Sequence, residues 1–151
     1  MQKGKLRNTM TLSKEAFEKL VAEGFERLPQ WVREKIKNVA LLVEDEPSKE
    51  VRKREGLRRN ETLLGYYHGI PLSARGEHYG VGPTMPDTIT LYQMPIEEAA
   101  FDNIGSYELP IFHDAVRSVV AETIWHEFAH HFGMDEGEVR RREQGRRDRV
   151  E

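Results

Sequence analysis

The chain is dominated by one amphipathic stretch, PIFHDAVRSVVAETIWHEFAHHF, which runs from Pro110 to Phe132. Its apolar residues recur at spacings of three and four, as they do on the buried side of an α-helix. They include Ile111, Phe112, Ala115, Val116, Val119, Val120 and Ile124. Gly133 follows directly, where a left-handed residue often caps the end of a helix. The pattern predicts a long helix with one buried face.

Near the end of this helix stands the sequence His126-Glu127-Phe128-Ala129-His130. Residues four apart lie on one helix face with Cβ atoms ~5–6 Å apart, so the two imidazoles can converge on one zinc ion. Glu127 is rotated by about 100° from His126, which suits a general base acting on metal-activated water. In the alternative interpretation, His126 and His130 are interfacial histidines on an amphipathic helix.

The composition is that of one globular domain with a highly charged surface. The 151 residues are enough for a single hydrophobic core. Lys and Arg number 23 and Asp and Glu 26, and the net charge of −3 argues against a globally basic nucleic-acid binder. Cysteine is absent, so histidines and carboxylates must hold any metal. The longest apolar run, residues 39–43, is far short of a ~20-residue membrane span, and no secretory signal is visible. We therefore expect a cytoplasmic protein.

The segments before the long helix predict shorter helices. Ser13 can cap a helix with apolar residues at helical spacing, which would extend to about Arg27. Pro29 suits the first turn of a second helix over residues 30–37. A third short helix is expected around residues 97–101.

Three segments predict β-strands. Residues 39–43 are apolar with β-branched ends and predict a buried strand. Residues 62–68 predict a second strand, and the Gly- and Pro-rich segment 73–86 predicts a loop. Residues 88–92 alternate polar and apolar side chains, which predicts a half-buried strand. This last strand is either an ordinary sheet strand or an edge strand on which a peptide can pair.

The expected domain organisation is simple, because no repeat or linker divides the chain. We expect one domain over residues 1–136, with a loose leader at 1–10 and a charged tail at 137–151. The stretch 49–59 carries six basic and two acidic residues. A solvated loop or helix face explains it, with phosphate or nucleic-acid binding as the alternative.

Together these motifs resemble those of the small bacterial zincin-like metallopeptidases, sometimes called minimal zincins. The resemblance is carried by HEFAHHFGMDE at 126–136, LGYY at 64–67, GIPL at 69–72 and PDTITLY at 86–92, and it covers roughly residues 11–136. It implies an α+β, zincin-like fold in which a small twisted β-sheet packs on a long active-site helix carrying HExxH. It also implies one Zn²⁺ ion and peptide-bond hydrolysis.

The third zinc ligand is expected just beyond the helix, because a catalytic zinc normally has three protein ligands. Gly133 can reverse the chain there. Glu136 stands three residues further on, at the position that metzincins fill with histidine, and can return towards the two histidines. Asp135 would point away in an extended segment, where successive side chains alternate, and it remains the alternative. Glu143 is the next candidate.

Further side chains are candidates for supporting roles. Glu122, one turn before the first motif histidine, either orients a ligand or is an exposed helix carboxylate. His131 either interacts with the C-terminal helix dipole or contacts the metal site or the substrate. A donor to the tetrahedral oxyanion is sought among Tyr92, His78 and Tyr107.

The favoured hypothesis is a zinc-dependent peptidase in which Glu127 is the general base and peptides or proteins are the substrates. The alternative is a catalytically silent zinc-binding scaffold or regulatory protein with the same fold. Binding of nucleic acid through residues 49–59 and the tail is a third hypothesis, but the tail's small net charge does not favour it. No membrane partner is expected, and the sequence leaves the oligomeric state open.

Overall fold

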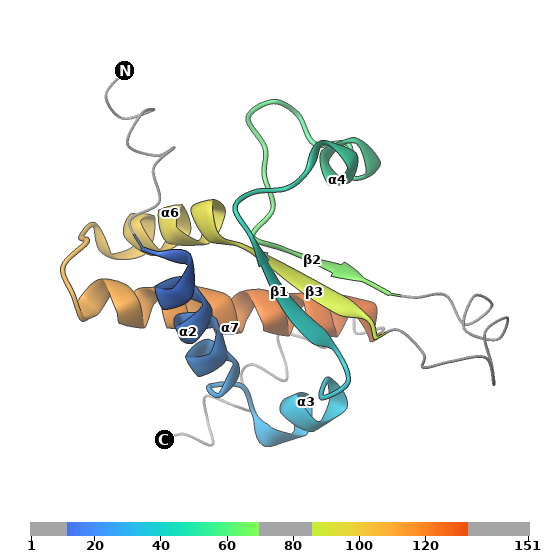
Figure 1. Cartoon of the computed structure of the whole chain (residues 1–151), viewed down its shortest axis with the longest axis horizontal. Coiled ribbons are helices and arrows are strands. Elements are labelled where there is room, and N and C mark those ends of the chain that lie inside the picture. Colours follow the sequence, from blue (N-terminus) through green and yellow to red (C-terminus); the bar gives the residue numbers. More distant parts are fainter. Residues whose placement is uncertain (1–11, 70–85, 133–151) are drawn as a thin grey trace, which may run out of the picture.

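The described residues form a mixed α+β fold with a small sheet. The structure, a computed structural model, describes residues 12–69 and 86–132. The elements are α2 (Lys14–Phe25), α3 (Gln30–Lys35), β1 (Ala40–Glu44), α4 (Lys49–Arg54), β2 (Gly65–His68), β3 (Thr88–Tyr92), α6 (Gln93–Ile104) and α7 (Ile111–His131). Figure 1 shows α7 running along the molecule, with α2, α6 and the sheet gathered against it.

The predicted long helix is confirmed as α7, which lies at the centre of the packing. Helices α2 and α6 and strands β2 and β3 all contact it. Its buried residues are Phe112, Ala115, Val116, Val119, Val120, Thr123, Ile124, Trp125, Phe128 and Ala129. Neither α7 nor any other helix within residues 12–69 and 86–132 combines the length and apolar character needed to cross a bilayer.

Helix α2 crosses α7 at very short range. Its predicted cap is confirmed, because the Ser13 hydroxyl accepts a 3.1 Å hydrogen bond from the N–H of Ala16. At Gly24, a Cβ atom would lie 2.8 Å from the carbonyl oxygen of Arg117 and 2.9 Å from Val120 Cγ1. A side chain at position 24 would therefore separate the two helices.

Two other predicted helices differ from expectation in length. Helix α3 follows Pro29 as predicted, but it ends at Lys35. The short helix expected at 97–101 is the middle of α6, which begins directly after β3. Pro95 lies in its first turn, where a missing N–H removes no intrahelical hydrogen bond. Gly105 caps the other end in the left-handed conformation, at φ 67°.

The sheet has the order β1–β3–β2, which places the strand at residues 88–92 in the centre. Strand β1 pairs parallel to β3, and β2 pairs antiparallel to it. Of the two alternatives for residues 88–92, the ordinary sheet strand is therefore confirmed and the edge strand is wrong. Four of its five residues are buried, because neighbours flank it on both sides and its polar members are small β-branched threonines. Within residues 12–69 and 86–132, β1 and β2 are the outer strands of the sheet.

The strand expected at 39–43 is present as β1, but the expectation that it is buried is wrong. Strand β1 lies at a sheet edge, and only one of its faces packs on the core. Leu42 is 44% exposed as a result.

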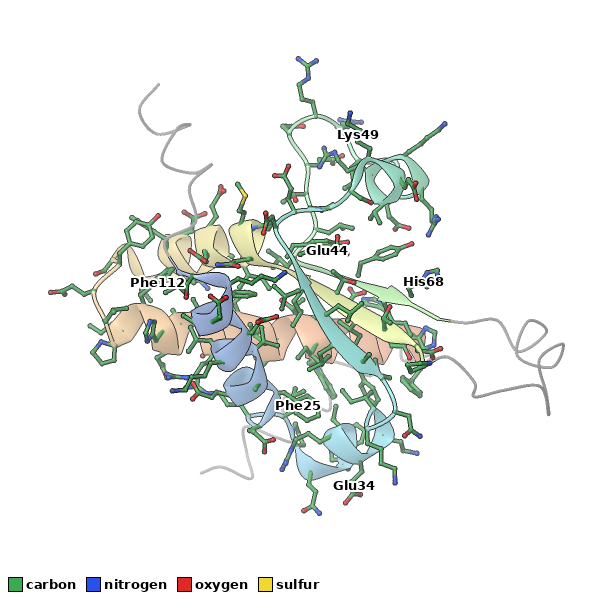
Figure 2. All side chains as sticks on the ribbon, in the orientation of Figure 1. Phe25, Glu34, Glu44, Lys49, His68 and Phe112 are labelled. Atoms are coloured by element: carbon green, nitrogen blue, oxygen red, sulfur yellow. The ribbon has the colours of Figure 1, made fainter. Side chains whose placement is uncertain are left out.

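The basic stretch belongs to an excursion between β1 and β2. Helix α4 lies within it, capped by the Ser48 hydroxyl, which accepts from the N–H of Val51. No residue of α4 is buried. The guanidinium of Arg52 donates to the carbonyl oxygen of Arg58 at 2.6 Å, and this hydrogen bond joins α4 to the loop that follows it. Figure 2 shows Lys49 on this projecting segment, and Glu44 where the chain leaves the sheet.

Candidate active site

The HExxH sequence lies in the last turns of α7, with its two histidines on the exposed side of the helix. His126 and His130 are exposed, and Phe128 between them is buried. Trp31 meets Trp125 and Phe128 edge to face, at ring-centroid distances of 5.9 Å and 5.7 Å. These aromatic contacts fix the rotation of the helix about its axis. They therefore also fix the direction in which the two imidazoles project.

The carboxylate of Glu127 is held by the edge strand β2. The backbone N–H of Tyr67 donates to Glu127 Oε1 at 2.9 Å. Leu64 accepts from the N–H of Tyr92 in β3, and in an antiparallel pair the inward and outward backbone groups alternate along the strand. The N–H and C=O groups of Gly65 therefore share the outward direction of Tyr67. The outer edge of β2 runs past the general-base candidate.

Opposing influences act on the pKa of the Glu127 carboxyl, and their net effect is to raise it. Burial, the largest influence, raises the pKa of this half-buried carboxyl above its ordinary value, and the nearby carboxylate of Glu55 acts in the same direction. The Tyr67 N–H opposes this by stabilising the anion, as do His130 and His126. A carboxylate with a raised pKa accepts and returns a proton more readily at neutral pH than an ordinary glutamate does.

The described side chains at the end of α7 can supply some, but not all, of the ligands of a zinc ion. Two imidazoles four residues apart are typical zinc ligands, while the carboxylate of Glu127 is engaged by a backbone amide. No group of three or more His, Asp or Glu suited to a metal occurs within residues 12–69 and 86–132. The predicted third ligand Glu136 and its alternatives, Asp135 and Glu143, lie outside the described residues.

His131, at the end of α7, contacts the side chain of Tyr67 in β2. Its ring stacks on that of Tyr67, with centroids 3.6 Å apart and planes 13° apart. The Tyr67 hydroxyl donates to Asp87 Oδ2 at 2.9 Å, and His131 Nε2 lies 3.8 Å from the same oxygen. Sequence reasoning assigned no role to Tyr67 or Asp87, although both lie in segments that carry the family resemblance. Their roles depend on how β2 lies on the helix, which no local pattern reveals.

A pocket of about 260 Å³ opens beside the motif, between residues 62–65 and α7. Its lining consists of Thr62, Leu63, Leu64, Gly65, Val119, Glu122, Thr123, His126 and Glu127. Glu122 therefore faces the same space as the first motif histidine. Sequence reasoning assigned no role in the site to Leu63, Leu64 or Thr123.

The candidates for the oxyanion donor are not brought together by the structure. Tyr92 is only 1% exposed, and burial, with smaller effects from nearby Glu44, Tyr66 and Glu127, raises its pKa to about 12. A phenol so enclosed is closed off from a substrate carbonyl.

Tyr107 lies at the opposite end of α7 from the motif. It contacts Phe112 at a centroid distance of 5.1 Å, and the helix places Phe112 about 21 Å from His126. His78 lies outside the described residues.

Comparison with known proteins identifies the family. A family model for zincin-like metallopeptidases matches residues 36–146, more than half of the chain, including the strands, α7 and the HExxH sequence. No curated protein matches the chain significantly. The chain belongs to the zincin-like metallopeptidase family, and its mixed α+β architecture agrees with that assignment.

Proposed function

We propose that the protein is a zinc-dependent peptidase whose site lies at the end of α7. One observation carries this proposal. A backbone amide of the neighbouring edge strand orients the carboxylate of Glu127, which lies beside two exposed histidines of the same helix. Membership of the metallopeptidase family supports the same reaction class. His126 and His130 are the proposed metal ligands, with Glu136 as the third and Asp135 as its alternative.

The proposed chemistry divides between the ion and Glu127. Zinc, when bound, would polarise the peptide carbonyl and lower the pKa of a bound water. The Glu127 carboxylate accepts the proton that the water loses when its oxygen attacks the carbonyl carbon. Glu127 then gives that proton to the leaving amine nitrogen as the C–N bond breaks. The Tyr67 N–H keeps Oε1 in place through both transfers.

The outer edge of β2 is the proposed docking line for the peptide backbone. An extended peptide can add to an exposed strand by main-chain hydrogen bonds. Gly65 itself is buried, and its outward N–H and C=O groups lie on this edge beside the pocket that Glu127 also lines. The pairing role considered for residues 88–92 thus passes to residues 65–68.

Cleavage of peptides by matched variants tests the proposal. Zinc-loaded wild-type protein is incubated with a fluorogenic peptide library and with unfolded casein, alongside Glu127→Gln and, as a control, Glu18→Gln on the exposed side of α2. We expect Glu127→Gln to bind zinc and to lose about 10²–10⁴-fold in rate, while Glu18→Gln cleaves like wild type. Zinc binding without cleavage by the wild type would contradict the proposal and favour a silent scaffold. Equal rates for Glu127→Gln and wild type would contradict the role of Glu127.

A further inference from the structure

The shape and charge of the pocket beside Glu127 indicate which substrate side chain the site accepts. It lies between residues 62–65, which lead into the proposed docking strand, and the turns of α7 just before the motif. A peptide paired on the outer edge of β2 would therefore place a side chain at its mouth. The inference that follows rests on the proposed peptidase function.

The walls of the pocket are apolar. Leu63, Leu64 and Val119 contribute aliphatic side chains. Thr123 uses its hydroxyl to donate to the carbonyl oxygen of Val119 at 2.7 Å. Its methyl group is turned towards Gly65, where an added Cβ would meet it at 2.7 Å. An aliphatic stem is the kind of group that these walls bury favourably.

The described charged side chains that line the pocket are acidic, and a zinc ion held by His126 would add positive charge only on the side of the motif. Glu122 and Glu127 line it, and in the described part of the chain no lysine or arginine does. Glu55 is close enough to raise the pKa of Glu127. Glu127 is engaged by the Tyr67 N–H, whereas Glu122 is exposed on the helix surface.

Arg54, a basic residue of the nearby segment between β1 and β2, is directed away from this pocket. It is paired with the hydroxyl of Tyr66, which raises the pKa of Arg54. Side chains alternate between the two faces of a strand, so Tyr66 lies on the face of β2 opposite to that of Gly65 and Tyr67. The cation of Arg54 is therefore held on the far side of the strand.

We infer that this pocket binds a lysine or arginine side chain of the substrate, with the aliphatic stem against Leu63, Val119 and the Thr123 methyl and the cation at Glu122. Lysine and arginine bury their methylene stems along apolar surfaces while the charged end stays near water, which matches a pocket with apolar walls and an exposed carboxylate. A substrate carboxylate would meet the like charge of Glu122 at the same place. The pocket is thus a specificity pocket for basic residues.

Peptide binding without turnover tests this inference separately from catalysis. The probes are three fluorescein-labelled peptides with blocked ends, alanine throughout except for a central Arg, Met or Glu. Fluorescence anisotropy measures their affinity for full-length, zinc-loaded Glu127→Gln protein. The measurement is repeated on the metal-free wild type, which retains Glu127.

We expect the Arg peptide to bind about two- to fivefold more tightly than the Met peptide in both proteins, as for a solvent-exposed ion pair. The Glu peptide should bind most weakly in the metal-free wild type, where no zinc ion attracts its carboxylate. The advantage of Arg should shrink in high salt. Adding Glu122→Gln should abolish it and Glu122→Lys should reverse it, while Glu18→Gln should leave it unchanged.

Equal affinities for Arg and Met, an Arg preference that survives Glu122→Gln, or no binding by any of the three peptides would overturn the inference. Failure of the proposed function has a different signature, namely the absence of cleavage by the zinc-loaded wild type.

Discussion

The N–H of Tyr67 donates a 2.9 Å hydrogen bond to Oε1 of Glu127, joining residues that are 60 positions apart in the chain. One bond thus sets two things: the direction of the proposed general base and the position of the edge strand over α7. A change that shifts β2 should therefore also disturb Glu127.

Replacing Glu127 by glutamine should stabilise the metal-free protein at neutral pH. The raised pKa means that the native state holds the proton more tightly than the unfolded chain does. The contribution of Glu127 to stability is therefore fully present below its ordinary pKa of 4.5 and is lost as the pH rises through its native pKa. Glutamine keeps an acceptor for the Tyr67 N–H without the charge.

Thermal unfolding of both metal-free proteins between pH 4 and pH 8 measures this effect. We expect Glu127→Gln to melt higher at pH 7–8, by about 2–4 °C for each kcal/mol gained, with a difference that shrinks on acidification. A difference that grows as the pH falls would contradict the burial argument.

Gly65→Ala should destabilise the contact between β2 and α7. The added Cβ would lie 2.7 Å from Thr123 Cγ2 and 3.2 Å from the carbonyl oxygen of Thr90, and such overpacking costs about 1–3 kcal/mol. Thr123→Ser removes the methyl group and keeps the hydroxyl donor to Val119. In urea unfolding, the double variant should recover part of the loss, because the two sites are in contact. Strictly additive losses would show that the clash is relieved elsewhere.

The stacked pair Tyr67 and His131 should show energetic coupling. Tyr67→Leu and His131→Ala each remove one ring of a stack whose centroids are 3.6 Å apart, and aromatic pairs contribute about 0.5–1.5 kcal/mol beyond buried area. A double-mutant cycle by urea unfolding should give a coupling of this size. Tyr67→Phe is the matched variant, since it keeps the ring and removes the hydroxyl that donates to Asp87. A coupling within error of zero would mean that the stack does not secure β2.

Glu136→Gln should weaken zinc binding more than Asp135→Asn. Glu136 is the proposed third ligand, and loss of a ligand should exceed the 10–100-fold cost of losing an outer-shell partner. Competition with a chromogenic chelator measures both affinities. Tight zinc in Glu136→Gln together with weak zinc in Asp135→Asn would reverse the assignment. Small, equal losses would point to Glu143.

The fold could be predicted from the sequence wherever local pattern decides structure. The periodicity of residues 111–131 and the cap at Ser13 depend on neighbours in the chain, and both predictions were confirmed. Strand order depends on distant pairing. Residues 88–92 show the alternation of a half-buried strand, yet neighbours on both sides place them in the centre of the sheet.

The same division applies to the candidate site. His126, Glu127 and His130 are visible because helical spacing places them. The Tyr67 amide carries no sequence signal, because every residue other than proline has an N–H. The close contact between Thr123 and residue 65 is possible only because Gly65 has no side chain. The sequence does not show this requirement, because it arises only when the strand packs on the helix.

X-ray diffraction recorded on both sides of the zinc absorption edge, from crystals of the zinc-loaded full-length protein, tests the central claim most directly. An anomalous difference peak should lie between the imidazoles of His126 and His130, within ~2.0–2.1 Å of one nitrogen of each. Glu127 should lie beside the peak and still accept from the Tyr67 N–H. A zinc peak elsewhere on the molecule, or one coordinated by neither histidine, would contradict the account.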